Sequence, residues 1–139
     1  MQQFPRAAAL LALVSLCLLS LLGCRSAATG SGGAAMSIDI SPPAVVGQPS
    51  AVTVTVSDAS GSPITGASVA VEGNMRHAGM VPVIAQAAEV SAGRYVASGF
   101  VFTMGGDWVV TAQAVLPDGK RVEKSVEVPG VPAAGGTSR

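Results

Sequence analysis

The chain is poor in the side chains from which most catalytic and metal sites are built. Among 139 residues it has one histidine, two cysteines and only 12% charged residues, with eight basic side chains against eight acidic ones. One histidine and two cysteines cannot supply a four-ligand His/Cys zinc site. Sparse, balanced charge does not provide the basic surface of a nucleic-acid-binding protein, so we expect no nucleic-acid partner. The length fits one domain, and 49% apolar residues are too many for a disordered chain.

The apolar residues are most concentrated near the N-terminus. Residues 1–6 carry one cation, Arg6, and residues 7–22 form an uncharged run rich in leucine and alanine. This run is short for a membrane-spanning helix, which needs about 20 apolar residues, and it has the order of a secretory signal. It ends in Leu-Leu-Gly-Cys at residues 21–24, which resembles the bacterial lipobox and predicts lipidation of Cys24. An uncleaved signal anchor, or an ordinary cleavage site that leaves a free thiol, are the alternatives.

These features predict how the chain is divided. We expect a lipoprotein signal peptide over residues 1–23 and a flexible tether, rich in Gly, Ser and Ala, over residues 24–35. Residues 129–139 are rich in Pro, Gly and Ala without periodicity, which predicts a disordered tail. The protein is therefore expected in the cell envelope, outside the cytoplasm, and anchored to the membrane through lipid. If the envelope has two membranes, Arg25 differs from the aspartate typical of inner-membrane retention, which favours the periplasmic face of the outer membrane.

Between the tether and the tail, residues 36–128 alternate apolar and polar side chains in short runs. In residues 52–57, for example, valine alternates with threonine and serine. A period of two with many β-branched residues is typical of half-buried strands, and clusters of Gly, Pro, Asp and Ser separate the runs. About seven such strands predict an all-β, immunoglobulin-like antiparallel β-sandwich. A small closed barrel is the alternative.

One segment departs from the strand pattern. The Met/His segment, residues 75–80, holds the only histidine and two of the five methionines. Thioether sulfur and imidazole are neutral donors that suit Cu(I), so Met75, His77 and Met80 are candidate metal ligands, with Gly79 allowing the chain to reverse. Alternatively Met75, and with it His77, ends the apolar face of the preceding strand, because methionine fills irregular core gaps well. The domain is then a non-metal structural or protein-interaction module of the cell envelope.

Other distinctive residues have structural roles as their first interpretation. Trp108 is expected to fill the core rather than stack on a ligand, and Met104 to pack into the core rather than act as a further soft ligand. Tyr95 is expected to form a hydrogen bond across a loop, as in a tyrosine corner. Asp107 is expected to cap the turn before Trp108, with orientation of a neighbouring donor as the alternative. We expect no enzyme activity, because the chain has no G-x-S-x-G motif and a single histidine, His77, to serve as a base.

Residues 58–128 resemble the YtkA-like domain family, which includes FixH-like proteins. The resemblance is carried by an ordered series of motifs: DASGSPI (58–64), GASV (66–69), NMRHAGM (74–80), GRY (93–95), FVF (100–102) and MGGDW (104–108). It implies an exported immunoglobulin-like domain that works with copper-handling or respiratory-oxidase assembly proteins. It also implies that the family's Met- and His-rich strand corresponds to Met75, His77 and Met80. This chain departs from the richer members in having one histidine only.

Overall fold

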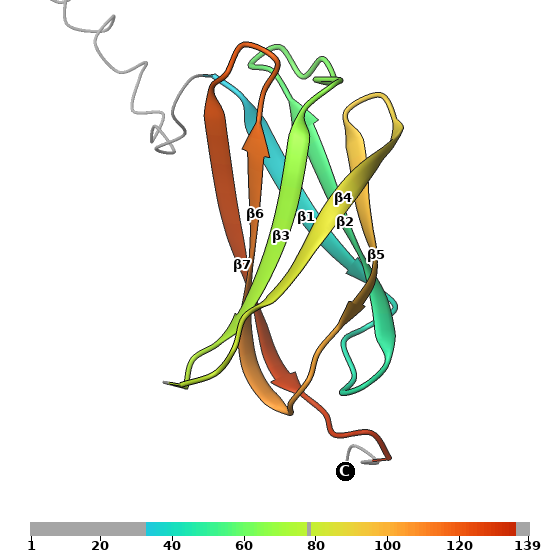
Figure 1. Cartoon of the computed structure of the whole chain (residues 1–139). Coiled ribbons are helices and arrows are strands. Elements are labelled where there is room, and N and C mark those ends of the chain that lie inside the picture. The colour runs from blue at the N-terminus through green and yellow to red at the C-terminus, as the bar shows by residue number, and fades with distance from the viewer. Residues whose placement is uncertain (1–32, 78, 136–139) are drawn as a thin grey trace, which may run out of the picture.

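A computed structural model of the chain describes residues 33–77 and 79–135. In that part of the chain every regular element is a strand, and none of it forms a helix long and apolar enough to span a membrane. The predicted signal peptide, Cys24 and most of the predicted tether lie outside the described residues. Seven strands follow one another along the chain (Figure 1): β1 (Ala35–Ser41), β2 (Pro49–Ser57), β3 (Ser68–Met75), β4 (Val83–Ser91), β5 (Arg94–Val101), β6 (Gly106–Val115) and β7 (Arg121–Val131).

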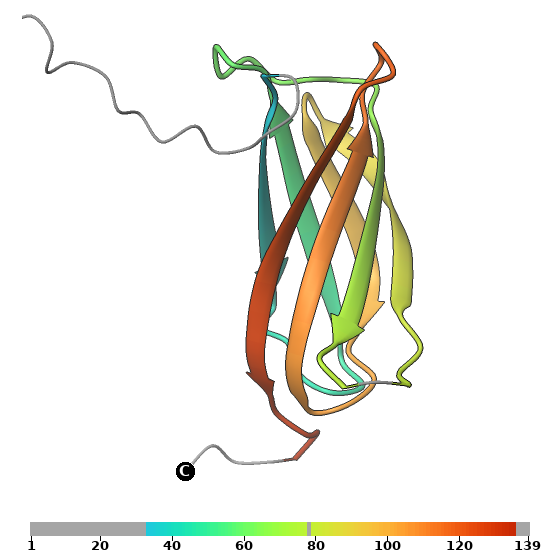
Figure 2. The same ribbon diagram turned by 90° about the vertical axis from the view of Figure 1, so that its left-hand side faces the viewer.

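The strands pair antiparallel in the order β1-β2-β5-β4-β3-β6-β7. They form two layers, β1-β2-β5 and β3-β6-β7, and β4 joins them because its first half pairs with β3 and its second half with β5. The predicted immunoglobulin-like antiparallel sandwich is confirmed. The crossing by β4 rolls the sheet nearly into a barrel. At its open side β1 and β7 lie next to each other without being hydrogen-bonded neighbours (Figure 2).

The core follows from the alternation along the strands. Val52, Val54 and Val56 of β2 are fully buried, and so are Val69 and Val71 of β3. In each strand the residues between them are more exposed. Because successive side chains of a strand point to opposite faces, these valines line the inner faces of the two layers.

Aromatic rings fill the core toward the end where β3 and β5 finish and β6 begins. Phe100 and Phe102 pack edge to face with ring centroids 5.2 Å apart, and Phe102 packs in the same way on Trp108 at 5.3 Å. Trp108 is 1% exposed, which confirms its expected place in the core. Its indole Nε1 donates a hydrogen bond of 2.9 Å to the carbonyl oxygen of Met104, so the buried N–H has an acceptor.

Tyr95 forms the cross-loop hydrogen bonds that the sequence predicts. Its ring is buried in β5, and its hydroxyl donates to the carbonyl oxygen of Ile64 at 2.8 Å. The same oxygen accepts from the backbone N–H of Ala67 at 3.0 Å. These two bonds fasten the β2–β3 connection to the sheet, as a tyrosine corner does.

The turn that follows β2 is organised by one carboxylate. Asp58 Oδ1 accepts hydrogen bonds from the hydroxyl and backbone N–H of Ser60 and from the N–H of Ser62. The hydroxyl of Ser60, followed by the N–H of Ser62, lowers the pKa of the exposed Asp58 carboxyl below its usual value. The stabilisation is therefore present above the unfolded pKa and is lost as pH falls through the folded pKa.

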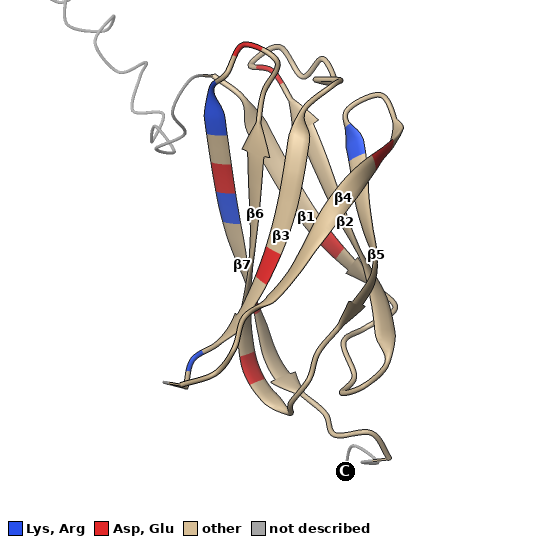
Figure 3. Ribbon diagram, viewed as in Figure 1, with Lys and Arg blue, Asp and Glu red and all other residues tan. Residues whose placement is uncertain are grey.

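The first and last strands extend past residues 36 and 128, the predicted ends of the domain. Strand β1 begins at Ala35, inside the predicted tether, and β7 continues through Val131, inside the predicted tail. Gly106 pairs with Val131, so this last stretch belongs to the sheet. Acidic and basic residues are spread over both layers (Figure 3), and both signs occur along β7: Arg121, Glu123, Lys124 and Glu127.

Candidate metal site at the β3–β4 connection

The first candidate ligand, Met75, is the last residue of β3 and lies at one end of the sandwich. Residues 69, 71 and 73 of β3 are buried, and Met75 continues this face as its last residue. Met75 stands opposite Trp108 of β6 and is half-buried against the core. This place agrees with the alternative interpretation for Met75, in which it ends the apolar face of β3. The same parity does not extend to His77, which is exposed, because β3 ends at Met75.

The other candidate ligands lie on the connection between β3 and β4. His77 is exposed and Met80 is half-buried, while Ala78 lies outside the described residues. Gly79 has φ +87°, a conformation that side chains with a Cβ rarely adopt, so it supports the predicted chain reversal. The three candidate donors are thus confined to the end of β3 and the short connection that follows it.

The first residue of this connection is held to the neighbouring strands. The guanidinium of Arg76 forms an ion pair with the carboxylate of Glu127 on β7, and the backbone N–H of Arg76 donates to the carbonyl oxygen of Asp107 at 3.4 Å. A small cavity of about 70 Å³ is bordered by these residues together with Trp108 and Pro129. The sequence did not reveal the ion pair, because opposite charges 51 positions apart carry no signal of contact.

Asp107 has a different role from the one expected. Its carboxylate Oδ1 accepts a hydrogen bond of 2.9 Å from the backbone N–H of Gly130. The expected cap of the turn before Trp108 is therefore wrong. The pairing of β6 with β7 is irregular between Gly106 and Trp108, and the carboxylate bridges the two strands at this irregularity.

Met104 does not lie in the core, where the alternation of residues 100, 102 and 104 predicts it. It is 46% exposed, so its assignment to the core is wrong. Strand β5 ends at Val101, and after Phe102 the chain turns through residues 103–105. Alternation of faces holds only while the chain stays extended, so Met104 does not continue the buried face of Phe100 and Phe102.

The three candidate donors are soft and neutral, although the carboxylates of Asp107 and Glu127 lie at the same end of the domain. Within residues 33–77 and 79–135, no three His, Cys, Asp or Glu side chains are grouped as a metal site would require. The donors on the β3–β4 connection are instead the thioethers of Met75 and Met80 and the imidazole of His77. This set matches the preference of Cu(I) and is a poor match to a hard divalent ion.

A family model described as YtkA-like matches residues 31–113 of the sequence. The chain belongs to the YtkA-like family. Among curated proteins, none matches the sequence. The matched range runs from β1 into β6 and includes the whole Met/His segment of this YtkA-like domain. It ends before β7, which supplies Glu127 to the ion pair with Arg76.

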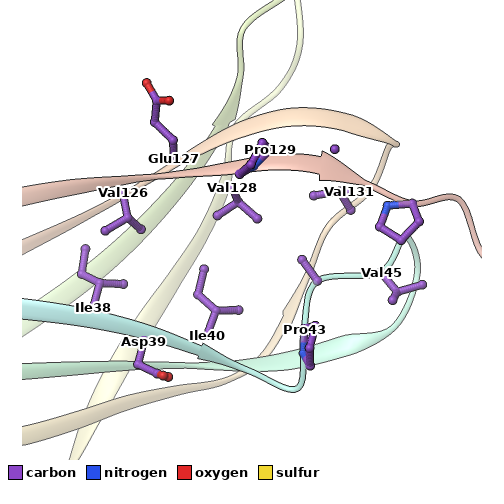
Figure 4. Close-up of a pocket in the computed structure, with 13 residues that line it drawn as sticks. Ile38, Asp39, Ile40, Pro43, Val45, Val126, Glu127, Val128, Pro129 and Val131 are labelled. Atoms are coloured by element: carbon purple, nitrogen blue, oxygen red, sulfur yellow. The ribbon is translucent and has the colours of Figure 1, made fainter. Parts of the chain in front are cut away.

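The YtkA-like domain has a second recess, an apolar groove at its open side. It has a volume of about 630 Å³, and Figure 4 shows Ile38 and Ile40 of β1 facing Val126 and Val128 of β7 across it. Alternation predicts the inward direction of these side chains. It does not predict that β1 and β7 end the sheet beside each other, because no hydrogen-bonded register joins them.

Proposed function

We propose that this YtkA-like protein is a lipid-anchored, extracytoplasmic accessory protein that binds Cu(I) through Met75, His77 and Met80. The observation that carries the proposal is the exposed imidazole of His77 on a short connection that also holds Met80 and starts from Met75. Cu(I) is a soft d10 cation that accepts thioether and imidazole ligands. None of these ligands is a thiolate, so the site is compatible with an oxidising compartment.

The position of the site suits a role in metal handling or in assembly of a respiratory oxidase. The connection lies at one end of the sandwich, where it is open to solvent and to a partner protein. The ion pair of Arg76 with Glu127 fixes the first residue of the connection to β7, while His77 is exposed to solvent. A metal bound there could pass to a copper-handling partner without unfolding of the domain.

Copper binding is tested with purified full chain in detergent, by competition for Cu(I) against a chromophoric chelator. His77→Ala and Met80→Ala are each expected to weaken Cu(I) binding by about tenfold or more, since even loss of an outer-shell partner of a metal ligand costs that much. Val81→Ala is the matched control, since Val81 is 82% exposed on the same connection and has no donor atom. Equal affinity in all variants would reject the site.

The lipid anchor is tested separately. Cys24→Ala is expected to abolish labelling by a radioactive fatty acid and to leave an unprocessed precursor or a soluble form, because the thiol is the expected site of acylation. The control is Cys17→Ala, which removes the other cysteine, inside the predicted signal peptide, and should leave labelling intact. Unchanged labelling of the Cys24 variant would contradict the lipoprotein assignment.

The second candidate is a non-metal structural or protein-interaction module of the cell envelope. The half-burial of Met75 favours it, because packing against the core is a sufficient role for this side chain. Absence of Cu(I) binding by the wild-type chain, in the competition experiment above, would make this candidate the conclusion.

A further inference from the structure

We propose that Met104, on the turn between β5 and β6, is a further thioether ligand of the same soft-metal site. The inference rests on the proposed Cu(I) function and extends its donor set to a second loop. It starts from the exposure of Met104, 46% of whose surface faces solvent although the side chain is apolar. Packing in the core is therefore not the role of the Met104 side chain.

The structure connects the Met104 turn to the end of β3 through Trp108. The indole N–H of Trp108 donates to the carbonyl oxygen of Met104 at 2.9 Å, and Met75 is the cross-strand partner of Trp108. The buried Trp108, which is 1% exposed, is thus bonded to the Met104 turn through its indole and paired with Met75 through its strand. Directly opposite residues on paired strands have Cβ atoms roughly 5 Å apart.

The side chain of Met75 reaches toward the same turn. Its methyl carbon lies 3.2 Å from the position that a Cβ on Gly106 would occupy. Gly106 is two positions from Met104 and begins β6. Met75 therefore lies over the residues that immediately follow Met104, and a metal held by Met75 is within reach of a flexible, unbranched thioether on this turn.

The charges at this end of the domain allow a cation to bind. Arg76 lies between two of the candidate ligands, and its positive charge alone would oppose a metal cation. The carboxylate of Glu127 pairs with the guanidinium and offsets that charge. With Met104 the donors become three neutral thioethers and one neutral imidazole, which favours a soft monovalent ion over Zn(II) or Cu(II).

Methionine-methyl NMR of the full chain in detergent tests the proposal directly. With ¹³C-methyl methionine, each residue has its own signal, and Ag(I) serves as a redox-stable soft d10 probe. We expect the methyl signals of Met75, Met80 and Met104 to shift together and to saturate at one equivalent. Met36 is buried in β1 and is the internal control, whose signal should stay in place.

The outcomes distinguish this inference from the proposed function. A stationary Met104 signal with moving Met75 and Met80 signals overturns the inference and leaves the proposed site intact. Stationary signals for all three methionines overturn both. Movement of Met104 without Met75 or Met80 also overturns the inference, because Met104 then binds silver at a separate place.

A substitution supplies the quantitative test. Met104→Leu keeps the size of an exposed side chain and removes the sulfur, so it should weaken Ag(I) and Cu(I) binding by about tenfold or more while thermal unfolding is unchanged. Met36→Leu removes a thioether outside the site and should leave affinity unchanged. Wild-type affinity in Met104→Leu would overturn the inference.

Discussion

Replacing Trp108 with alanine is expected to destabilise the domain by about 3–5 kcal/mol. The indole is 1% exposed, packs edge to face on Phe102 and donates its N–H to the carbonyl oxygen of Met104. Alanine would remove the largest fully buried side chain of the core and leave a cavity between the two layers. Small domains have only about 5–15 kcal/mol of total stability, so the variant could lose most of its folded population.

Chemical denaturation followed by circular dichroism measures this loss. Trp108→Phe is the informative control, because it keeps an aromatic ring in the core and removes only the indole N–H and part of the volume. It should lose less stability than Trp108→Ala. A loss below about 1 kcal/mol in the alanine variant is in the range of surface substitutions, and it would contradict the burial of Trp108.

The architecture was predictable because a strand has a simple rule for which side chains are buried. Val52, Val54 and Val56 are buried as alternation requires, and the turns occur where Gly, Pro and Asp are clustered. Tyr95 was predictable for a related reason. A buried hydroxyl needs a hydrogen-bond partner, and it has two on the β2–β3 connection.

The errors lie where the chain leaves the regular strand. Met104 follows Phe100 and Phe102 at a spacing of two, yet β5 has ended and the spacing no longer predicts a face. Asp107 forms its hydrogen bond with Gly130, far along the chain. The position of Met104 depends on where β5 ends, and the hydrogen bond of Asp107 depends on β7 becoming the neighbour of β6. Local sequence contains neither piece of information.

The candidate site could be predicted only as a list of donor types. Spacing alone singled out Met75, His77 and Met80, but it could not distinguish the half-buried Met75 from the exposed His77. The ion pair between Arg76 and Glu127 depends on β3 and β7 flanking β6. The types of donor atom could therefore be predicted from the sequence. The contacts that hold the site in place depend on the order of the strands and could not.

Gly93→Ala is the other substitution expected to have a large effect, a loss of roughly 2–5 kcal/mol from backbone strain and overpacking together. Gly93 lies in the turn between β4 and β5 with φ +67°, where a Cβ is disfavoured. A Cβ built there would lie 2.7 Å from the carbonyl oxygen of Val56 and 2.7 Å from the Cβ of Pro63. The Val56 oxygen is backbone and cannot swing aside. The carbonyl of Gly93 also accepts the N–H of Val56 at 2.8 Å, so moving the turn would break this hydrogen bond.

Gly119→Ala separates the two causes of this loss. Gly119 also has a left-handed φ, +82°, but a Cβ there meets nothing within 4 Å. Its substitution should therefore cost only the backbone strain, about 1–2 kcal/mol. The difference between the two variants, measured by denaturant titration under the same conditions, reports the clash with Val56 and Pro63. Equal losses would mean that the β4–β5 turn shifts freely, and would contradict the close contact between Gly93 and the end of β2.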